Sequence, residues 1–221
     1  MYTVESLKAH LSAQPRPGLA LDIDDALCIL GKRWYDELAA LVGHPGLTFE
    51  EVVEQYGLFH LVPAWKDKPQ VEDWIQATLH SNEHYLSLSP IEKARERVQD
   101  ILSHIPIHAY ITMRSAAVVE STLHWLKQNG FPDLPVLFRP LDTSKDEMHG
   151  WKGKAIAALH PEIVGIVDDD VRVIHQLPNY YSGTIFLFGG RTCEREGIRV
   201  VPCRDWDEVY EKVKVMGLAE S

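Results

Sequence analysis

Short apolar runs alternate with helix-patterned segments over the second half of this chain, and that alternation limits the fold more than any other feature. Residues 105–112, 136–138, 163–167, 185–188 and 198–201 have the composition of strands, and residues 116–129, 153–159 and 206–215 have helical spacing. Residues 18–21 supply one more apolar strand near the start. Strands separated by helices pair in parallel, so the pattern predicts an α/β, Rossmann-like sheet covered by helices on both faces.

The segment between the first and second predicted strands has a different pattern. Helical spacing covers residues 32–42, 71–80 and 90–104, and Thr48 with Glu51 forms a capping-box pattern that predicts a helix start. No strand pattern occurs between residues 28 and 104. We therefore expect a core made of residues 1–27 and 105–221, with residues 28–104 inserted as an all-helical cap.

Composition narrows the classes of partner. The formal net charge of -10 repels nucleic acid backbones and argues against nucleic acid as the main partner. No apolar run is long enough to cross a bilayer, and the N-terminus lacks the pattern of a signal peptide. The three scattered cysteines, Cys28, Cys193 and Cys203, do not form a disulfide framework. These features predict a cytoplasmic protein with no membrane contact, and they leave its oligomeric state open.

Polar side chains follow three of the predicted strands. Asp22 and Asp24 follow the first, Thr112 and Arg114 end the second, and an aspartate run starts at Asp168. The carboxyl ends of parallel strands share one edge of the sheet, so these groups are expected to lie close together. Two like charges about 4 Å apart repel by roughly 4 kcal/mol at an effective dielectric near 20. Such a cluster requires a cation, and all-oxygen ligands favour Mg²⁺ over zinc.

These residue types can carry out phosphoryl transfer. One aspartate can act as a nucleophile and form an aspartyl-phosphate, and a carboxylate two residues later can donate and accept the proton. Thr112 offers a hydroxyl to the phosphoryl oxygens. A lysine is needed to offset the accumulated negative charge, and Lys152 and Lys154 both stand near a predicted helix start.

In order along the chain, the motifs Asp22-Ile23-Asp24, Thr112-Met113-Arg114, Trp151-Lys152-Gly153-Lys154 and Asp168-Asp169 resemble those of the haloacid dehalogenase-like (HAD) phosphohydrolases. The resemblance covers most of the chain outside residues 28–104. It implies that Asp22 is the nucleophile and Asp24 the general acid and base. It also implies that Mg²⁺ is held by Asp22, by Asp24 through its carbonyl, and by Asp168 or Asp169. The candidate phosphate-binding residues are Thr112, Met113, Arg114, Lys152 and Lys154. For Arg114 the alternatives are a solvated arginine and a structural ion pair with the acid cluster. Of the two lysines, Lys152 fits the helix pattern better.

Two features refine the resemblance. The family usually has Thr or Val where this chain has Ala26, and often Gly where it has Asp25, a departure that leaves the chemical groups in place. The helical insertion stands where the family carries a C1-type cap. The all-helical cap, the Thr112-Met113-Arg114 motif and the segment from Asp205 to Val209 look like the 5'-nucleotidase and deoxyribonucleotidase-type branch.

The expected function is Mg²⁺-dependent hydrolysis of a small phosphate monoester through an aspartyl-phosphate. A nucleoside monophosphate is the first candidate substrate, and a sugar phosphate or another small metabolite is the alternative. Two rivals remain open: a non-catalytic HAD-like binding protein, which Asp25 and Ala26 favour, and a phosphatase acting on nucleic acid ends, which the negative charge disfavours.

Overall fold

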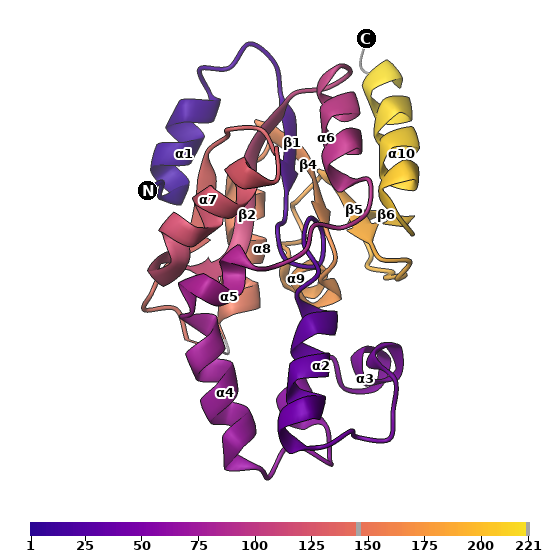
Figure 1. Ribbon diagram of the computed structural model, residues 1–221. Helices are drawn as coiled ribbons and strands as arrows, with labels where there is room; N and C mark the ends of the chain where they lie inside the picture. The colour runs from indigo at the N-terminus through magenta and orange to yellow at the C-terminus, as the bar shows by residue number, and fades with distance from the viewer. Residues whose placement is uncertain (145–146, 220–221) are drawn as a thin grey trace.

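The computed structural model of the protein describes residues 1–144 and 147–219 (Figure 1). Its strands form one sheet with parallel pairing throughout and the order β3-β2-β1-β4-β5-β6. The strands are β1 (Gly18–Leu21), β2 (Ile107–Ser115), β3 (Val136–Arg139), β4 (Ile163–Asp168), β5 (Thr184–Phe188) and β6 (Arg199–Cys203). This architecture confirms the predicted Rossmann-like α/β core. Residues 145–146 and 220–221 of the predicted core range lie outside the described residues.

Helices connect and cover these strands. The α-helices are α1 (Val4–Leu11), α2 (Gly31–Val42), α3 (Phe49–Tyr56), α4 (Pro69–Leu79), α5 (Asn82–Leu86), α6 (Ala94–Leu102), α7 (Val119–Gln128), α8 (Met148–Ala158), α9 (Val171–Gln176) and α10 (Trp206–Ala219). Two short 3-10 helices are η1 (Phe59–Leu61) and η2 (Ala116–Val118). The capping box of Thr48 and Glu51 is present at the start of α3, as the sequence predicts.

Alternation along β1 shows how the sheet divides the core into two layers. Leu19 and Leu21 pack in a hydrophobic cluster with side chains of α6, α7 and α10. Ala20, between them, packs in a second cluster with side chains of α1, α8 and α9. Successive strand residues point to opposite faces, so both faces of the sheet are buried. The strand ends at Leu21, where Asp22 begins the polar segment.

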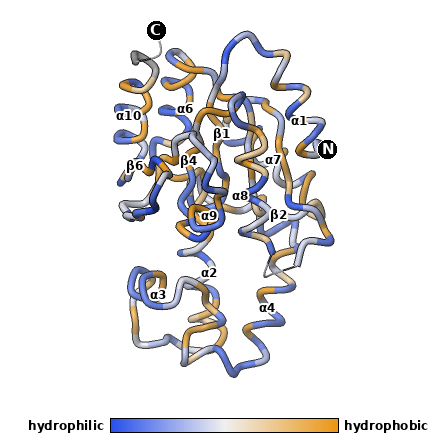
Figure 2. The backbone as a smooth tube through the Cα atoms, turned by 180° about the vertical axis from the view of Figure 1, so that it is seen from behind, coloured by the Kyte–Doolittle hydropathy of each residue, from blue (hydrophilic) through white to orange (hydrophobic). Residues whose placement is uncertain are grey.

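Helices α2, α3 and α4 form a lobe of their own, set apart from the sheet in both views (Figures 1 and 2). The lobe has a separate hydrophobic cluster that includes Tyr35, Leu38, Val52 and Trp65. The aromatic side chains of Tyr35 and Trp65 are buried in this cluster. Within residues 28–104, all of which the structure describes, the regular elements are helices.

The last two helices of the predicted insertion pack on the sheet domain. Tyr85 of α5 and Val98 and Ile101 of α6 belong to the same hydrophobic cluster as Leu19 and Leu21. The predicted cap of residues 28–104 thus consists of a separate lobe, α2–α4, and two helices that cover the core. An amphipathic helix shows which of its faces is buried but not which element covers that face, so the sequence pattern carried no information about this division.

The two chain segments that join the lobe to the core run beside each other. The N–H of Ile29 donates to the carbonyl of Ser89 at 2.9 Å, and the N–H of Ile91 donates to the carbonyl of Leu27 at 2.8 Å. Cys28 and Pro90 form an isolated antiparallel bridge between these bonds. This paired connection lies directly after the segment that contains Asp22 and Asp24. No helix among the described residues is long and apolar enough to span a membrane.

Candidate active site

The site lies at the carboxyl end of β1, which is flanked by β2 and β4. Leu21 pairs with Val167 of β4 on one side and with Tyr110 of β2 on the other. The N–H of Asp22 continues the sheet by donating to the Val167 carbonyl at 2.9 Å. The chain leaves β1 between two strands whose own ends carry polar side chains, the arrangement in which α/β sheets bind ligands.

Three carboxylates gather at this edge. Oxygens of Asp22, Asp168 and Asp169 all lie within 4.8 Å of one another. Lys152 of α8 is completely buried, and its Nζ lies 2.8 Å from Asp22 Oδ1 and 2.8 Å from Asp168 Oδ2. Lys154, the other candidate, is exposed to solvent. The helix phase thus brings Lys152 into the cluster and turns Lys154 away from it.

Burial shapes the ionisation of this cluster. Loss of solvent raises the pKa of Asp22 to about 8, although the ammonium of Lys152 opposes the shift. Burial also raises the pKa of Asp168 and Asp169, and repulsion from neighbouring carboxylates adds to the effect at Asp169. Burial works to lower the pKa of Lys152, but attraction to Asp168 and Asp22 outweighs it and raises that pKa.

The donor set fits a divalent cation. The three carboxylates are offset by the Lys152 ammonium and by the Arg191 guanidinium 3.6 Å from Asp169, so the ionised cluster still carries excess negative charge in a buried volume. A carboxylate removed from water requires a compensating charge, and clustered oxygen donors are the ligands that Mg²⁺ takes in proteins. Asp22, Asp168 and Asp169 can therefore hold Mg²⁺, and the carbonyl of Asp24 is a further candidate ligand.

Asp24 does not join the carboxylate cluster through its side chain. The Nε of Arg114 donates to both oxygens of the Asp24 carboxylate, at 3.1 Å each, and the Nη2 of Arg114 donates to Oδ1 at 2.7 Å. The Arg114 side chain has no solvent exposure, whereas that of Asp24 is 17% exposed. Arg114, one of the predicted phosphate-binding residues, is thus paired with the Asp24 carboxylate.

Thr112 and Met113 lie on β2 beside the Asp22–Asp24 segment. Thr112 is fully buried, and its Oγ1 accepts a hydrogen bond from the Arg114 N–H at 3.2 Å. Met113 is half-buried, and its carbonyl accepts from Nε of Arg139 at 3.1 Å. Both the Thr112 hydroxyl and the Met113 carbonyl therefore have a partner within the protein.

The turn after Asp24 explains the unusual residues at positions 25 and 26. Asp25 has a φ of 55°, a backbone conformation that glycine adopts freely and that aspartate tolerates better than most residues. Its carboxylate accepts the N–H groups of Leu30 and Gly31 at the start of α2, at 2.9–3.0 Å. Ala26 is buried, and its carbonyl accepts the indole N–H of Trp206 at 2.8 Å. Both residues therefore have a structural role in the turn.

The sequence did not single out the residues that surround the cluster. Arg191 follows β5, and its Nη1 donates to the Asp169 carbonyl at 3.0 Å and lies 3.6 Å from Asp169 Oδ2. The sequence feature nearest to Arg191 is the pair Gly189-Gly190. These glycines have φ values of 88° and 74° and turn the chain sharply at the end of β5. A glycine pair after a strand indicates a tight turn but does not identify the contact that the next residue makes.

Asp170, the last residue of the aspartate run, caps α9. Its side chain accepts the N–H of Arg172 at 2.9 Å and the Nε of Arg172 at 2.8 Å. His149 Nε2 lies 3.3 Å from its other oxygen. Burial works to raise the pKa of Asp170, but His149 and Arg172 outweigh it and hold the pKa below its usual range. Asp170 is therefore satisfied by its own neighbours.

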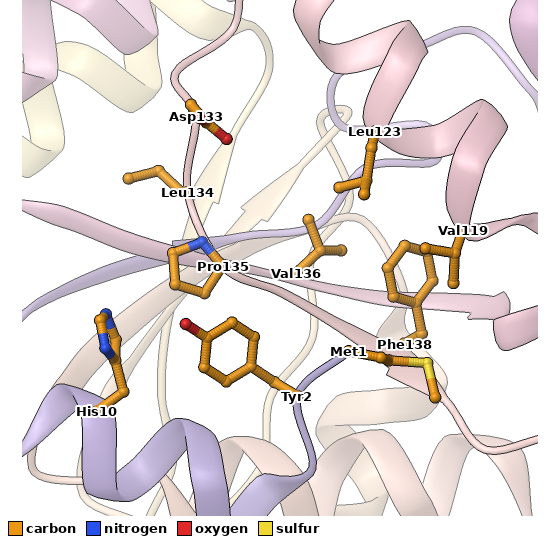
Figure 3. A pocket seen from close by; sticks show the side chains of 10 residues that line it. All are labelled: Met1, Tyr2, His10, Val119, Leu123, Asp133, Leu134, Pro135, Val136 and Phe138. Carbon is orange, nitrogen blue, oxygen red and sulfur yellow. The ribbon is translucent and has the colours of Figure 1, made fainter.

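A surface pocket of about 450 Å³ lies elsewhere, at the β3 edge of the sheet (Figure 3). Side chains from the N-terminus, α1, α7 and β3 line it, among them Tyr2, His10 and Phe138. None of the cluster carboxylates is among its lining residues. The pocket is therefore separate from the candidate site.

No protein-family model and no curated protein match the sequence. Solved structures do resemble the fold. A HAD family hydrolase from Deinococcus radiodurans R1, solved with bound phosphate and sodium, is 13% identical, with 93% of this chain and 96% of that chain covered and a TM-score of 0.50. A HAD-superfamily hydrolase of subfamily IA from Geobacter sulfurreducens PCA is 12% identical, with 90% and 96% covered and a TM-score of 0.50.

A dehalogenase solved as an intermediate complex is also similar, at 12% identity, with 90% of this chain and 98% of that chain covered and a TM-score of 0.51. At these identities the likeness concerns the fold. The protein has the haloacid dehalogenase-like fold, as its motifs predict. The function must be argued from the site itself.

Proposed function

We propose that the protein is a Mg²⁺-dependent phosphatase that hydrolyses small phosphate monoesters through an aspartyl-phosphate on Asp22. The observation that carries the proposal is the contact of one buried lysine with two carboxylates: Lys152 Nζ lies 2.8 Å from both Asp22 and Asp168. A third carboxylate, Asp169, completes the cluster, and a separate carboxylate, Asp24, follows two residues after Asp22.

The residues divide the reaction into two half-reactions. In the first, Asp24 starts in its protonated form. An oxygen of Asp22 attacks phosphorus, the bond to the leaving oxygen breaks, and Asp24 gives its proton to that oxygen and becomes a carboxylate. In the second, Asp24 takes a proton from water, the water oxygen bonds to phosphorus, and the bond between phosphorus and Asp22 breaks. Lys152 offsets the negative charge of the acceptor carboxylate. Asp22, the Asp24 carbonyl and Asp168 or Asp169 would hold a Mg²⁺ ion, which would supply further positive charge to the site.

Asp25 and Ala26, which favoured a non-catalytic binding protein, have structural explanations. Asp25 caps α2, and the Ala26 carbonyl accepts a hydrogen bond from Trp206. Neither contact involves the side chains of Asp22 and Asp24. These contacts support the enzymatic proposal over the binding protein. A cytoplasmic location and a similarity to the 5'-nucleotidase and deoxyribonucleotidase-type branch stay predictions.

The substrate class we propose first is a nucleoside monophosphate, and a sugar phosphate or another small metabolite is the alternative. The helical lobe supports a small substrate, because a cap over the strand ends excludes water and large molecules. Partly buried aromatic side chains of the lobe, Trp34 and Trp74, pack edge to face, with ring centroids 5.4 Å apart. They are candidates for contact with a planar base.

A panel of phosphorylated metabolites tests the proposal directly. Phosphate release would be measured for nucleoside monophosphates, sugar phosphates, a generic aryl phosphate and a 5'-phosphorylated oligonucleotide, with Mg²⁺ and with a chelator. We expect Mg²⁺-dependent release from small monoesters and little from the oligonucleotide. A folded protein that binds Mg²⁺ and releases no phosphate from any of them would instead support the binding protein.

The stability of the metal-free protein should depend on pH through Asp22. The folded pKa, about 8, lies above the ordinary aspartate pKa of 3.8, so the folded state holds this proton more tightly than the unfolded chain. The corresponding stability is complete below the unfolded pKa and is lost as the pH rises through about 8. Mg²⁺ binds the ionised carboxylates, and at about 100 times its Kd it should add about 2.7 kcal/mol.

Thermal unfolding checks this prediction between about pH 6 and about pH 9. With a chelator, we expect the melting temperature to fall over this range, and Mg²⁺ to raise it more at the alkaline end. Asp22→Asn is the matched control, because it removes the Asp22 carboxyl and leaves Asp168 and Asp169, whose pKa values are also raised, in place. A pH dependence identical in this variant and in the wild type would show that Asp22 does not cause it.

A further inference from the structure

Arg114 is enclosed behind the candidate general acid. Besides its contacts with both Asp24 oxygens, its Nη1 donates to Thr122 Oγ1 at 3.1 Å. Its Cζ lies 4.4 Å from the centroid of the Tyr85 ring, and its Nη2 lies 3.3 Å from Cys28 Sγ. With no part of the side chain exposed, the guanidinium is occupied by groups of the protein.

We propose that Arg114 is a positioning residue that holds the Asp24 carboxylate for proton transfer and does not bind the phosphoryl group. The proposal rests on the proposed phosphatase function, and it assigns to Arg114 a role other than the phosphate contact that the sequence motif implies. The geometry that carries it is the contact of one buried guanidinium with both oxygens of one carboxylate.

The geometry of the pair fixes the orientation of the carboxylate. A guanidinium is planar and presents its donors as a rigid fork, so contact with both oxygens restrains rotation of the carboxylate as well as its position. Thr122 and Tyr85, from α7 and α5, hold the guanidinium in turn. The 17% exposure of Asp24 leaves one side of its carboxylate accessible to a leaving group or to water. Lysine carries the same charge but cannot reproduce the fork.

The two possible roles of Arg114 differ in their kinetic signatures. A phosphate ligand stabilises the phosphoryl group whatever the leaving group, so its loss should raise KM and add to the loss caused by Asp24→Asn. A positioning residue acts through Asp24, so its loss should lower kcat most for substrates whose leaving group must receive a proton. Alkyl phosphates, with poor leaving groups, need that proton more than 4-nitrophenyl phosphate does.

The experiment is a double-mutant cycle with Arg114→Ala, Asp24→Asn and the double variant, measured in single-turnover and steady-state assays. We expect Arg114→Ala to slow turnover of an alkyl phosphate about 100-fold, with a smaller effect on aryl-phosphate cleavage and little change in KM. The double variant should match Asp24→Asn within about threefold, because the two residues act as one unit. Added guanidinium ion should restore part of the rate to Arg114→Ala and none to the double variant.

Arg114→Lys and Arg97→Ala complete the set. Arg114→Lys keeps the buried charge, so it tests the proposal even if the alanine variant fails to fold, and we expect about a tenfold loss with the alkyl phosphate. Arg97 Nε pairs with Asp207 at 2.6 Å, between α6 and α10 and outside both the carboxylate cluster and the Arg114–Asp24 pair, so its removal should leave the kinetics unchanged. Additive losses with a raised KM, or full activity of Arg114→Lys, would overturn the positioning role alone. Absence of turnover in the wild type would overturn the phosphatase proposal and this one with it.

Discussion

Asp22→Asn is expected to abolish turnover while leaving the fold intact. The amide has the shape of the carboxylate but is a very poor nucleophile, and the covalent route has no other acceptor, so we expect a loss of at least about 10⁴-fold in kcat. The fold should survive because the substitution removes one negative charge from a buried cluster, and Lys152 keeps its ion pair with Asp168 at 2.8 Å.

The measurement is phosphate release with saturating Mg²⁺, together with mass spectrometry of acid-quenched protein. Wild-type protein should gain the mass of one phosphoryl group, and Asp22→Asn should gain none. Asp170→Asn is the matched control, because Asp170 caps α9 outside the carboxylate cluster. Its activity should stay far above that of Asp22→Asn. Near-native turnover by Asp22→Asn would show that another group is the nucleophile.

Lys152→Met is expected to have the largest effect on stability. The substitution keeps much of the side-chain volume and removes the ammonium that contacts Asp22 and Asp168. Removing one partner of a buried ion pair typically costs about 3–5 kcal/mol, because the other partner stays buried without compensation. We expect a loss of this size in metal-free protein at neutral pH, together with a loss of phosphatase activity.

Lys154→Met provides the matched comparison, since Lys154 lies two residues away on the same helix and is exposed. Its unfolding free energy should stay within about 0.5 kcal/mol of the wild type. Chemical denaturation measures both variants. Mg²⁺ or a lower pH should recover part of the stability of Lys152→Met, because each reduces the uncompensated negative charge. Equal effects of the two substitutions would contradict the placement of Lys152 in the cluster.

The sequence carried the fold well because strands β1 to β5 are almost wholly buried. Apolar runs that end in Asp22, in Thr112 and in Asp168 identify both the strands and the edge of the sheet at which they meet. The choice between Lys152 and Lys154 could be argued from helix phase, because Lys152 shares a face with the apolar residues one and two turns later. The structure buries Lys152 and exposes Lys154.

Contacts between distant segments could not be predicted from strand patterns or helix phase. Arg114 meets Asp24 across 90 residues of chain, and Trp206 meets Ala26 across 180. Nothing in the local pattern around either residue specifies its partner. The same limit explains α6, which the sequence places in the inserted segment and the structure places against α10. Periodicity shows which face of a helix is buried, and the tertiary fold decides what covers it.

The paired connection at Leu27–Ile29 and Ser89–Ile91 joins the two chain segments that enter and leave the lobe. Two hydrogen bonds hold the outgoing and returning segments together, so a rotation of the lobe would move both segments together. The outgoing segment begins three residues after Asp24, and the Asp25 carboxylate accepts hydrogen bonds from the Gly31 N–H at the start of α2. Rotation of the lobe would therefore pull on the loop that carries the proton donor, and substrate capture and proton transfer would be mechanically linked.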